Sequence, residues 1–468
     1  MFSKVLIANR GAIAVRIVRT LRQLGIKSVA VFAEADRDSL HVTAADEAYC
    51  LGEGPAATTY LDQALLLRAA SATGADAIHP GYGFLSENAE FCEACDRRGI
   101  AFVGPTPEQM RLFGLKHTAR EVARESGVPL LPGTDLLLEQ AAATEAATAI
   151  GFPVIVKSTA GGGGRGMQVC HGPDEVEQAF GSVRRLGEST FANDGVFVEK
   201  YVGSARHIEV QVFGDGAGKA LALGERDCSA QRRNQKVIEE TPAPGLADAL
   251  REQIHATAVA LMEAVAYRGA GTVEFLLDTR TQEFYFLEVN TRLQVEHGVT
   301  EQVFDVDLVA WMLQLAAGDM PPLEEVAAGL SPCGHAIQVR LYAEDPNKDF
   351  QPCSGLLTAV EFPVHDGHAL RIDHWLSRGI VVSPFYDPML AKIISYAGDR
   401  RAAIDAIERA LAQTAIEGIE TNRDYCRAVL NDAVFIAGKM DTRYLQTFEW
   451  QPETIDVLSA GTLSTVQD

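Results

Sequence analysis

The densest group of residues capable of chemistry lies at residues 283–297, EFYFLEVNTRLQVEH. Two kinds of side chain alternate along its first half, which predicts a strand with two distinct faces. One face is predicted to carry Phe284, Phe286, Glu288 and Asn290. The phenylalanines argue against full solvation of this face, so the segment indicates a binding site. The alternative is an exposed face whose acids point into water.

A second strand is predicted just upstream, at residues 271–278, GTVEFLLD. If the residues between the two strands form a hairpin loop, Asp278 pairs with Phe284, and Glu274 lies opposite Glu288. Two carboxylates directly opposed on one face repel each other unless a cation lies between them. Carboxylate and amide oxygens suit hard divalent cations. The hairpin therefore predicts a Mg²⁺ or Mn²⁺ site whose ion is shared with substrate phosphates.

The chain beyond the second strand adds a candidate anion site. If it stays extended as far as Glu296, then Arg292 and Gln294 project on the same side as the metal carboxylates. An arginine between a metal site and a glutamate can bind a small oxyanion while the glutamate removes its proton.

A glycine-rich run at residues 160–166, AGGGGRG, lies between two predicted strands. Each glycine loses much backbone entropy on ordering, so the run suits a mobile flap whose N–H groups close over phosphates. Lys157 before the flap and Lys116 farther upstream are placed to reach those phosphates as point charges. No GK[ST] follows, so this is not a Walker loop. A flexible linker is the alternative.

A third polar cluster covers residues 225–240, ERDCSAQRRNQKVIEE. Its charges do not follow the spacing of a salt-bridged helix. The amides that can hold ribose or phosphate oxygens are Gln231, Asn234 and Gln235. The basic residues that indicate a small anionic ligand are Arg232, Arg233 and Lys236. A solvated loop is the alternative.

Composition limits the classes of partner. The chain has 468 residues, of which 47% are hydrophobic, and this predicts roughly two to four domains. A net charge of −22 argues against nucleic acid and anionic membranes as partners. Eight cysteines include one close pair, Cys92 and Cys95, which we interpret as thiols in a reducing cytoplasm rather than a zinc or redox site. The expected location is cytoplasmic, because no signal-peptide layout and no membrane-length apolar run occurs.

The elements that position these groups begin with a parallel α/β unit extending to about residue 113. Its strands are predicted at residues 4–8, 28–32, 75–79 and 101–103, and its first helix at residues 13–24. Such sheets bind ligands beyond the carboxyl ends of their strands, so the turn at residues 80–83 and Glu87 are site candidates. The alternative is a tight turn that needs glycine for its backbone alone. The first turn, NRGAIA, lacks the dinucleotide fingerprint.

The remaining chain reads as a hinge, a small α+β unit and a larger antiparallel region. Residues 115–131 are predicted to be helical, and VPLLPG at residues 128–133 resembles a hinge. The small unit is predicted to contain a helix at residues 141–149 and strands at residues 152–158 and 167–170. Antiparallel strands are expected from residue 206 onward, with a later helix at residues 402–415.

Taken together, the motifs resemble the biotin carboxylase branch of the ATP-grasp ligases. The matching stretches are NRG at 9–11, HPGYGFLSEN at 79–88, KSTAGGGGRGM at 157–167, ERDCSAQRRNQK at 225–236, LEVNTRLQVEH at 287–297 and GHAIQVRLYAEDP at 334–346. The resemblance covers roughly residues 1–446. It implies an α/β and α+β fold with an N-terminal parallel α/β domain, a mobile ATP-grasp lid and a C-terminal antiparallel-sheet lobe. The implied divisions are residues 1–113, a connecting helix and hinge at 114–133, the lid at 134–201, the lobe at 202–446, and a linker with a truncated carboxyltransferase start at 447–468.

Site residues follow from the resemblance position by position. The implied nucleotide contacts are Lys116, Lys157, Gly162, Gly163, Gly164, Met167, Glu199, Lys200, Val202, His207, Gln231, Asn234, Glu274 and Glu288. The implied metal ligands are Glu274, Glu288 and Asn290. The implied bicarbonate and biotin pocket consists of Lys236, Arg292, Gln294, Val295, Glu296 and Arg340. Within that pocket Glu296 matches the general base, and the other catalytic residues are Lys236, Arg292 and Arg340.

The implied reaction uses ATP, Mg²⁺ or Mn²⁺, and bicarbonate to carboxylate biotin through carboxyphosphate. Several stretches resemble the urea carboxylase (urea amidolyase) group within the family. They are GLKHTAR at 114–120, KSTA at 157–160, GESTFANDGVF at 187–197, RRNQKVIEETPAP at 232–244, SPFYDPMLAKII at 383–394 and the tail at 455–468. This resemblance implies a biotin carrier domain and a carboxyltransferase as partners, and a homodimer. The alternatives are a guanidine, acyl-CoA or pyruvate carboxylase, another ATP-grasp ligase, or a non-catalytic nucleotide-binding module.

Three positions depart from the usual pattern of the family. Ala12 replaces a glutamate, Gly298 replaces a proline, and Asn234 replaces a histidine common in bacterial members. At residue 234 the urea carboxylase group resembles this chain in having asparagine. Ala12 and Gly298 are expected to loosen the first turn and the catalytic loop. Neither of these two removes a group assigned to the chemistry.

Overall fold

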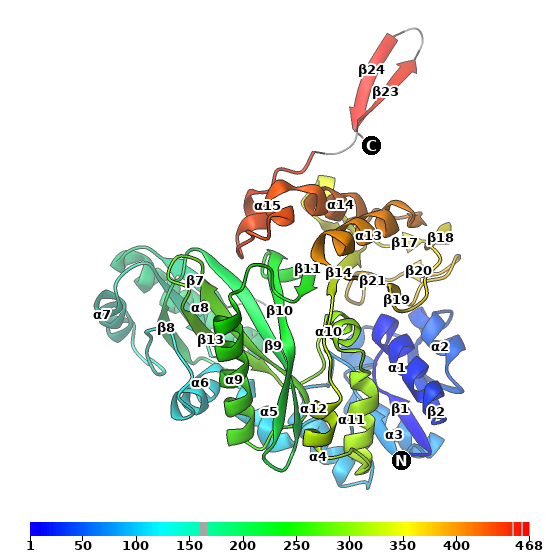
Figure 1. Ribbon diagram of the computed structural model, residues 1–468, viewed down its shortest axis with the longest axis horizontal. Helices are drawn as coiled ribbons and strands as arrows, with labels where there is room; N and C mark the ends of the chain where they lie inside the picture. The colour runs from blue at the N-terminus through cyan, green and yellow to red at the C-terminus, as the bar shows by residue number, and fades with distance from the viewer. Residues whose placement is uncertain (160–165, 192, 452–453, 460–461, 468) are drawn as a thin grey trace.

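The computed structural model (Figure 1) describes residues 1–159, 166–191, 193–451, 454–459 and 462–467. The predicted flap glycines Gly162, Gly163 and Gly164 lie outside the described residues. No helix in the described part of the chain is long and apolar enough to cross a bilayer.

The N-terminal part is a five-stranded parallel sheet in the order β3-β2-β1-β4-β5. Its strands are β1 Lys4–Ile7, β2 Lys27–Ala33, β3 Glu47–Gly52, β4 Ala77–His79 and β5 Ala101–Phe102. Its helices are α1 Gly11–Gln23, α2 Leu40–Ala44, α3 Gln63–Thr73, α4 Ala89–Asp96 and α5 Pro107–Gly114. Leu6 enters the core on one face of β1, whereas Val5 and Ile7 enter the core on the other. The predicted βαβ unit is confirmed. Its strands are apolar and buried on both faces, and such strands need helices above and below the sheet.

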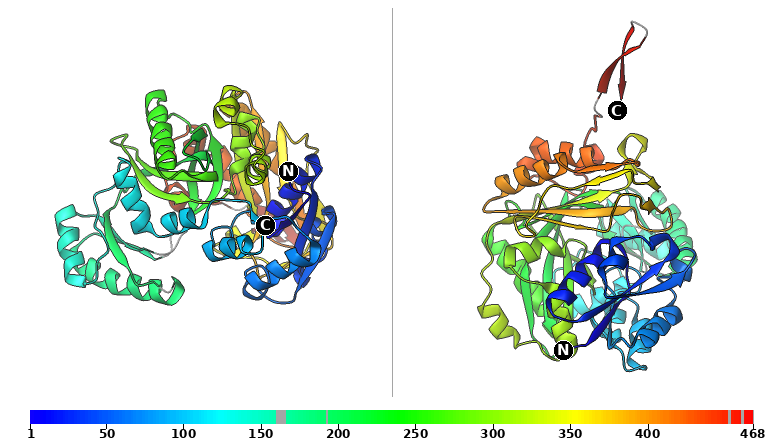
Figure 2. Two further views of the ribbon diagram at one scale, coloured as in Figure 1. Left: turned by 90° about the horizontal axis from the view of Figure 1, so that it is seen from below. Right: turned by 90° about the vertical axis from the view of Figure 1, so that its right-hand side faces the viewer.

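A connecting helix leads into the lid. Helix α6, Lys116–Glu125, is shorter than predicted, since the chain reverses at Gly127 with φ +72°. The lid contains α7 Gln140–Ile150, α8 Pro173–Phe191 and the antiparallel strands β6 Val154–Ser158, β7 Met167–Cys170 and β8 Val196–Lys200. Both lid helices pack on the lid sheet around one apolar cluster. In Figure 2 the lid and the N-terminal sheet lie on opposite sides of the molecule, below the larger sheet.

The largest element is an eight-stranded antiparallel sheet in the order β13-β12-β9-β10-β11-β14-β21-β19. Its strands are β9 Ala205–Asp215, β10 Ala220–Arg232, β11 Gln235–Thr241, β12 Arg268–Asp278, β13 Phe284–Asn290, β14 His335–Tyr342, β19 Leu370–His374 and β21 Met389–Ala397. Helices α9 Asp248–Ala264, α10 His297–Phe304, α11 Leu308–Ala317 and α12 Leu323–Ala328 connect or cover these strands. The predicted antiparallel region after residue 206 is confirmed.

The C-terminal part covers one end of this sheet. It contains α13 Arg400–Ala412, α14 Arg423–Asn431, α15 Ala433–Ile436 and α16 Tyr444–Thr447. The short strands are β15 Glu344–Asp345, β16 Gln351–Pro352, β17 Gly355–Leu356, β18 Ala359–Glu361, β20 Val381–Val382 and β22 Ala415–Glu417. A last hairpin, β23 Thr454–Ser459 with β24 Thr462–Gln467, stands clear of the body (Figure 1). The domain divisions inferred from the sequence stay predictions.

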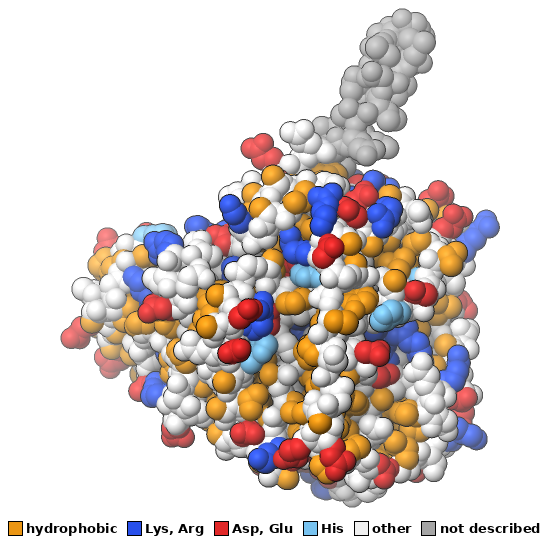
Figure 3. Space-filling view, viewed as in Figure 1, with side chains coloured by type: hydrophobic (Ala, Val, Ile, Leu, Met, Phe, Trp, Pro, Cys, Tyr) orange, Lys and Arg blue, Asp and Glu red, His pale blue; other side chains and the backbone are white. Residues whose placement is uncertain are grey.

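Acidic and basic side chains are interspersed on the face drawn in Figure 3, from which the lid projects. The excess of negative charge therefore does not gather into one acidic region on this face.

Candidate functional site

A cavity of about 680 Å³ opens where the N-terminal sheet, the lid and the large sheet meet. Tyr82 lines it from the first part, Lys157 from the second and Arg340 from the third. The predicted site residues that line this cavity are Glu87, Lys116, Lys157, Met167, Glu199, Lys200, Val202, His207, Gln231, Asn234, Gln235, Lys236, Glu274, Glu288, Asn290, Arg292, Gln294, Val295 and Arg340. The predicted base Glu296 is fully buried and does not line it. Folding thus brings together residues that are spread over more than two hundred positions.

The β12–β13 hairpin places Glu274 directly opposite Glu288, as predicted. The route to this register differs from the prediction. Phe284 pairs with Leu277 rather than with Asp278, and the ladder shifts by one residue between the pairs Phe275–Phe286 and Glu274–Glu288. The shift is a β-bulge, because one residue of β13 at this point has no partner on β12.

The bulge also corrects the predicted face of β13. Phe284 and Phe286 belong to the apolar core, together with Val289. Leu287, Glu288 and Asn290 instead line the cavity. A bulge inserts one residue into the alternation. Even-numbered residues of β13 therefore point into the core before the bulge and into the cavity after it. The predicted grouping of the two phenylalanines with Glu288 and Asn290 is therefore wrong.

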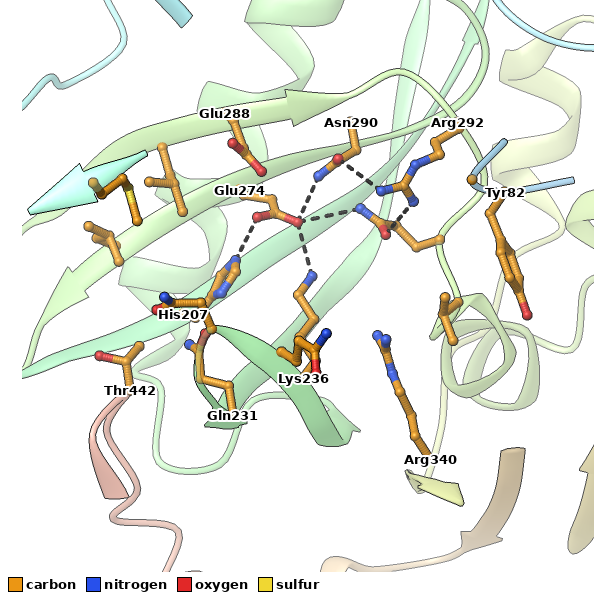
Figure 4. Close-up of a pocket in the computed structure, with 18 of the residues that line it drawn as sticks. Tyr82, His207, Gln231, Lys236, Glu274, Glu288, Asn290, Arg292, Arg340 and Thr442 are labelled. Carbon is orange, nitrogen blue, oxygen red and sulfur yellow. Dashed lines mark hydrogen bonds and ion pairs between the residues drawn. The ribbon is translucent and has the colours of Figure 1, made fainter. Parts of the chain in front are cut away.

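The carboxylate of Glu274 contacts several nitrogen donors (Figure 4). Glu274 accepts hydrogen bonds from Asn290 Nδ2 at 2.8 Å and from Lys236 Nζ at 3.0 Å, and lies 2.7 Å from His207 Nε2. Burial alone raises the pKa of Glu274, but Lys236 and His207 outweigh it and hold the pKa at about 2. Glu274 is therefore an ionised, hydrogen-bonded carboxylate at neutral pH.

Glu288 is bound from the opposite side of the cavity. Lys116 Nζ, at the start of α6, donates a hydrogen bond to its carboxylate at 2.5 Å. Burial raises the pKa of Glu288, but Lys116 lowers it by more than burial raises it, and the resulting pKa is about 2. The two ionised carboxylates are the hard oxygen donors that Mg²⁺ prefers, so the residues present fit a hard divalent cation. The Asn290 amide oxygen, which accepts from Arg292 Nη2 at 3.2 Å, is a further oxygen donor on the same strand.

Lys236 is the centre of a buried ion network beneath the cavity. Its Nζ lies 2.5 Å from Glu209, 3.0 Å from Glu274 and 2.7 Å from Glu296. Although burial lowers its pKa, the surrounding acidic groups raise the pKa of Lys236 well above the ordinary value for lysine. Three carboxylates thus share one permanent cation.

Glu296 is fully buried and held by two cations. Lys236 contacts one of its oxygens, and Arg340 Nη2 donates to the other at 2.9 Å. Burial and Glu209 raise the pKa of Glu296, but Lys236 and Arg340 lower it further, so the net shift is downward. An ionised carboxylate fixed in this way is suited to accept a proton from a bound acid.

The segment before Glu296 is not the extended strand that the sequence predicts. Strand β13 ends at Asn290, and the chain then turns into α10 at His297. Arg292 Nε donates to Glu87 at 2.9 Å, and its Nη1 donates to Gln294 Oε1 at 2.8 Å. The expected side chains still meet, because contacts with the N-terminal part set their direction instead of strand alternation.

The N-terminal turns form the opposite wall. Asn9 Nδ2 donates to the carbonyls of Pro80 and Tyr82 at 2.7 and 2.8 Å, and the Gly81 N–H donates to His79 Nδ1 at 3.0 Å. Gly81 has φ +65°, and a Cβ at this position would lie 2.9 Å from the Asn9 amide. The glycine-rich turn therefore packs tightly beside the first turn of the chain and presents Tyr82 to the cavity.

The lid contributes a second set of charges. Lys157 Nζ donates to Glu199 at 2.5 Å, and Arg120 of α6 pairs with the same carboxylate. Burial, Lys116 and Arg120 lower the pKa of Lys157 to about 7. Lys200 points its ammonium to the carbonyls of Gly151 and Phe152, at 2.8 and 3.1 Å. Lys157 is thus the lid cation that a phosphate would meet, whereas the Lys200 ammonium is bound to backbone.

The basic cluster at residues 225–240 is a hairpin rather than a solvated loop. Strands β10 and β11 turn at Arg233 and Asn234, with φ +50° and +63°. Arg232 pairs with Glu344 at 2.6 Å and Arg233 with Asp349 at 2.5 Å. Neither arginine lines the cavity, whereas Lys236 does, so the expectation of an anionic ligand stays a prediction for these two arginines.

Sequence reasoning missed several residues of the site. Glu209 contacts Lys236 from β9, and its alternation with His207 and Gln211 along an otherwise apolar strand is the signal that could have identified it. Arg120 carried no such signal. Thr442 also lines the cavity; it lies near the end of the predicted lobe, and its N–H donates to the carbonyl of Ala205 at 2.8 Å.

Two further expectations concern other positions. Cys92 and Cys95 are buried in the N-terminal core, where burial raises the pKa of each thiol to about 12, and all eight cysteines are free. Gly298 is buried in α10, and a Cβ there would contact Ile394 too closely. Ala12 packs with Trp375 in a small apolar cluster.

Comparisons with known proteins agree with the geometry. Residues 1–110 match the family described as biotin carboxylase, N-terminal domain. Residues 116–325 match the carbamoyl-phosphate synthase L chain, ATP binding domain, and residues 338–447 match the biotin carboxylase C-terminal domain.

Individual relatives are also similar. A biotin carboxylase of Halalkalibacterium halodurans is 48% identical over 446 residues, covering 95% of this chain and 97% of the relative. A urea amidolyase of Lachancea kluyveri is 50% identical over 467 residues, covering 100% of this chain. This chain spans 25% of that relative's length.

A solved structure shares the fold. It is the biotin carboxylase domain dimer of 2-oxoglutarate carboxylase from Hydrogenobacter thermophilus, in complex with MgADP, ADP and bicarbonate. Its TM-score is 0.90 at 39% identity, over 95% of this chain and 97% of that chain.

Proposed function

The chain belongs to the biotin carboxylase family, and from that premise we propose that it carboxylates biotin with ATP and bicarbonate. The observation that carries the proposal is the setting of Glu296. This ionised carboxylate is buried directly behind Lys236 and Arg340, two cations that line the same cavity as Lys116 and Lys157. A base for a small acid is thus held next to a cavity that carries the cations for a triphosphate.

The first step joins bicarbonate to phosphate. Arg292 and Gln294 bind the anion, and Glu296 takes its proton. The carbonate oxygen then attacks the γ-phosphorus of ATP, and the bond from that phosphorus to the bridging oxygen breaks. The products are carboxyphosphate and ADP, which is the leaving group. Lys116 and Lys157 neutralise the charge that develops on the phosphoryl oxygens.

The metal would be held by Glu274, Glu288 and Asn290. When bound, a Mg²⁺ ion supplies charge neutralisation at the phosphates. The identity of the ion as Mg²⁺ or Mn²⁺ is part of the proposal. Lys116 contacts Glu288 and Lys236 contacts Glu274, so both ammonium groups lie beside the residues that would hold the ion.

The second step transfers the carboxyl group. Carboxyphosphate breaks into CO₂ and phosphate beside the ureido ring of biotin, and the phosphate takes the N1 proton. Arg340 stabilises the resulting enolate, whose N1 attacks CO₂ to form carboxybiotin. The lid excludes water, because carboxyphosphate hydrolyses readily.

The larger reaction is also proposed. We assign the chain to a urea carboxylase-type enzyme, in which a biotin carrier domain and a carboxyltransferase act on the carboxybiotin formed here. The similarity to urea amidolyase supports this acceptor over guanidine, acyl-CoA or pyruvate. A homodimer and a cytoplasmic location belong to the same proposal, and free cysteines agree with a reducing compartment.

The test is release of ADP under controlled bicarbonate. With Mg-ATP and bicarbonate, free biotin is expected to raise the rate of ADP release, and removal of bicarbonate abolishes the increase. A rate of ADP release that is independent of biotin but increases with another carboxylate would instead support a different ATP-grasp ligase. Urea, guanidine and acyl-CoA compounds are then compared as acceptors in the intact polypeptide.

A further inference from the structure

Lys392 is a buried lysine that the proposed reaction does not use. It lies on β21, and its side chain is 0% exposed. Its Nζ donates a hydrogen bond to the carbonyl oxygen of Val295 at 2.9 Å and lies 3.5 Å from a carboxylate oxygen of Asp373. Since a buried ammonium is costly unless its charge and its donors are satisfied, these two contacts define where it sits.

The sheet register links Lys392 to the catalytic loop. Strand β21 runs between β14 and β19, and Lys392 pairs with Arg340 on one side and with Asp373 on the other. Directly paired residues project on the same face of a sheet. Arg340 reaches the carboxylate of Glu296, and Lys392 reaches the carbonyl of the preceding residue. Two adjacent positions of the sheet therefore hold two consecutive residues of the loop.

The counterion of Lys392 is itself fixed. Arg371 Nη2 donates to Asp373 at 2.6 Å, and its Nη1 donates to Glu301 of α10 at 2.6 Å. Helix α10 begins immediately after the loop. The ammonium is thus anchored to the element that continues the loop as well as to the loop itself.

The orientation of the Val295 carbonyl determines where Glu296 can point. The peptide unit between the two residues is planar, so fixing the carbonyl also fixes the N–H and the Cα of Glu296. Val295 lines the cavity, whereas the Glu296 carboxylate is fully buried against Lys236 and Arg340. If this peptide rotated, the carboxylate would leave both cations.

We propose that Lys392 is a positioning residue that holds the Val295 carbonyl and thereby aims the Glu296 carboxylate at the bound acid. The ammonium does not contact substrate in this assignment. The inference rests on the proposed function, in which Glu296 is the base.

The principal test replaces Lys392 with methionine, which keeps the apolar stem of the side chain and removes the ammonium donor. For Lys392→Met, kcat for biotin- and bicarbonate-dependent ADP release is expected to fall at least about tenfold, because small displacements of a reacting group are costly. The dissociation constant for Mg-ATP is expected to stay within about twofold. A kcat equal to that of the unmodified chain would overturn the assignment.

A matched control lies far from the site. Lys4 Nζ donates to the carbonyl of Thr73 at 2.7 Å and pairs with Glu47 at 2.7 Å, so it also joins a carbonyl to a carboxylate. Lys4→Met is expected to leave kcat unchanged. Equal losses in both variants would show a general cost of removing such lysines and would contradict a positioning role.

Hydrogen–deuterium exchange gives a readout that does not need turnover. Amides of residues 294–299 are expected to exchange faster in Lys392→Met than in the unmodified chain or in Lys4→Met. If the unmodified chain shows no biotin-dependent turnover, the proposed function fails while exchange still decides the role of Lys392. Identical exchange over residues 294–299 would refute the positioning role.

A second variant covers the case in which Lys392→Met does not fold. Glutamine at this position keeps a polar side chain, but its amide nitrogen lies one bond nearer the backbone than the lysine Nζ and carries no charge, so we expect it to lose the hydrogen bond to the Val295 carbonyl. Lys392→Gln is therefore expected to fold with the same faster exchange and the same loss of kcat. Wild-type exchange and kcat in this variant would overturn the inference.

Discussion

Glu274 and Glu288 lie directly opposite each other across the β12–β13 hairpin, yet each carboxylate is bound by a different lysine. Lys236 contacts the first from strand β11 of the same sheet, and Lys116 contacts the second from the connecting helix. Their mutual repulsion is therefore relieved by ammonium groups. A bound metal would compete with those lysines, which gives the site two charge-balanced states.

Glu288→Gln is expected to weaken Mg-ATP binding at least about tenfold, because the amide is a poorer ligand for Mg²⁺ than a carboxylate. Titration calorimetry with Mg-ATP, and with ATP in EDTA, measures the effect, and the difference between the two should shrink in the variant. Glu283→Gln is the control, since Glu283 lies in the same hairpin but is exposed and contacts Tyr285. Equal losses in both variants would contradict a metal-binding role.

Glu296→Gln is expected to lower biotin-dependent ADP release by orders of magnitude while Mg-ATP binding is retained, because the amide cannot accept the bicarbonate proton. Steady-state kinetics and calorimetry on the same preparation separate the two effects. Glu263→Gln on the exposed side of α9 serves as the control. Turnover that survives in the Glu296 variant would exclude it as the base.

Lys236→Met is expected to destabilise the folded chain by about 3–5 kcal/mol, because Glu209, Glu274 and Glu296 would lose their shared cation inside the protein. Urea unfolding followed by circular dichroism measures the change. Lys219→Met, at an exposed position between β9 and β10, should change the free energy of unfolding by no more than about 0.5 kcal/mol. A similar small change for Lys236 would show that the network contributes little to stability.

Acid is expected to destabilise the fold through His79. Burial lowers the pKa of this imidazole from 6.5 to about 3, so the folded chain binds fewer protons here than the unfolded chain between those values. Its contribution is fully present above pH 6.5 and is lost as the pH falls toward 3, with a slope of up to about 1.4 kcal/mol per pH unit.

His79→Asn checks this slope, because asparagine offers an acceptor for the Gly81 N–H without titrating near neutral pH. Free energies of unfolding at pH 7 and pH 5 should differ less in this variant than in the unmodified chain. His171→Asn, at an exposed position, should keep the original difference. If the pH dependence of the free energy of unfolding is unchanged in His79→Asn, His79 does not cause the acid destabilisation.

Local patterns predicted much of the fold and of the hairpin. Alternating apolar residues identified the strands, and the spacing of Glu274 and Glu288 gave their register correctly. The same alternation failed at Leu287, because a bulge is an unpaired residue whose position depends on the neighbouring strand and not on the local pattern. The ion pairs of Arg232 and Arg233 could not be predicted either, since their partners Glu344 and Asp349 lie more than a hundred positions away in sequence.

The sequence alone determined which chemical groups are present and which residues form strands, because hydrophobic periodicity and turn residues act over a few positions. The tertiary structure decided which charges meet. Only the folded sheet brings Lys236 against three carboxylates and places Arg340 and Lys392 beside consecutive residues of the catalytic loop. Such contacts join strands far apart in sequence, and they are strong because the charges are buried. Burial depends on the whole fold and cannot be predicted from a short stretch of sequence.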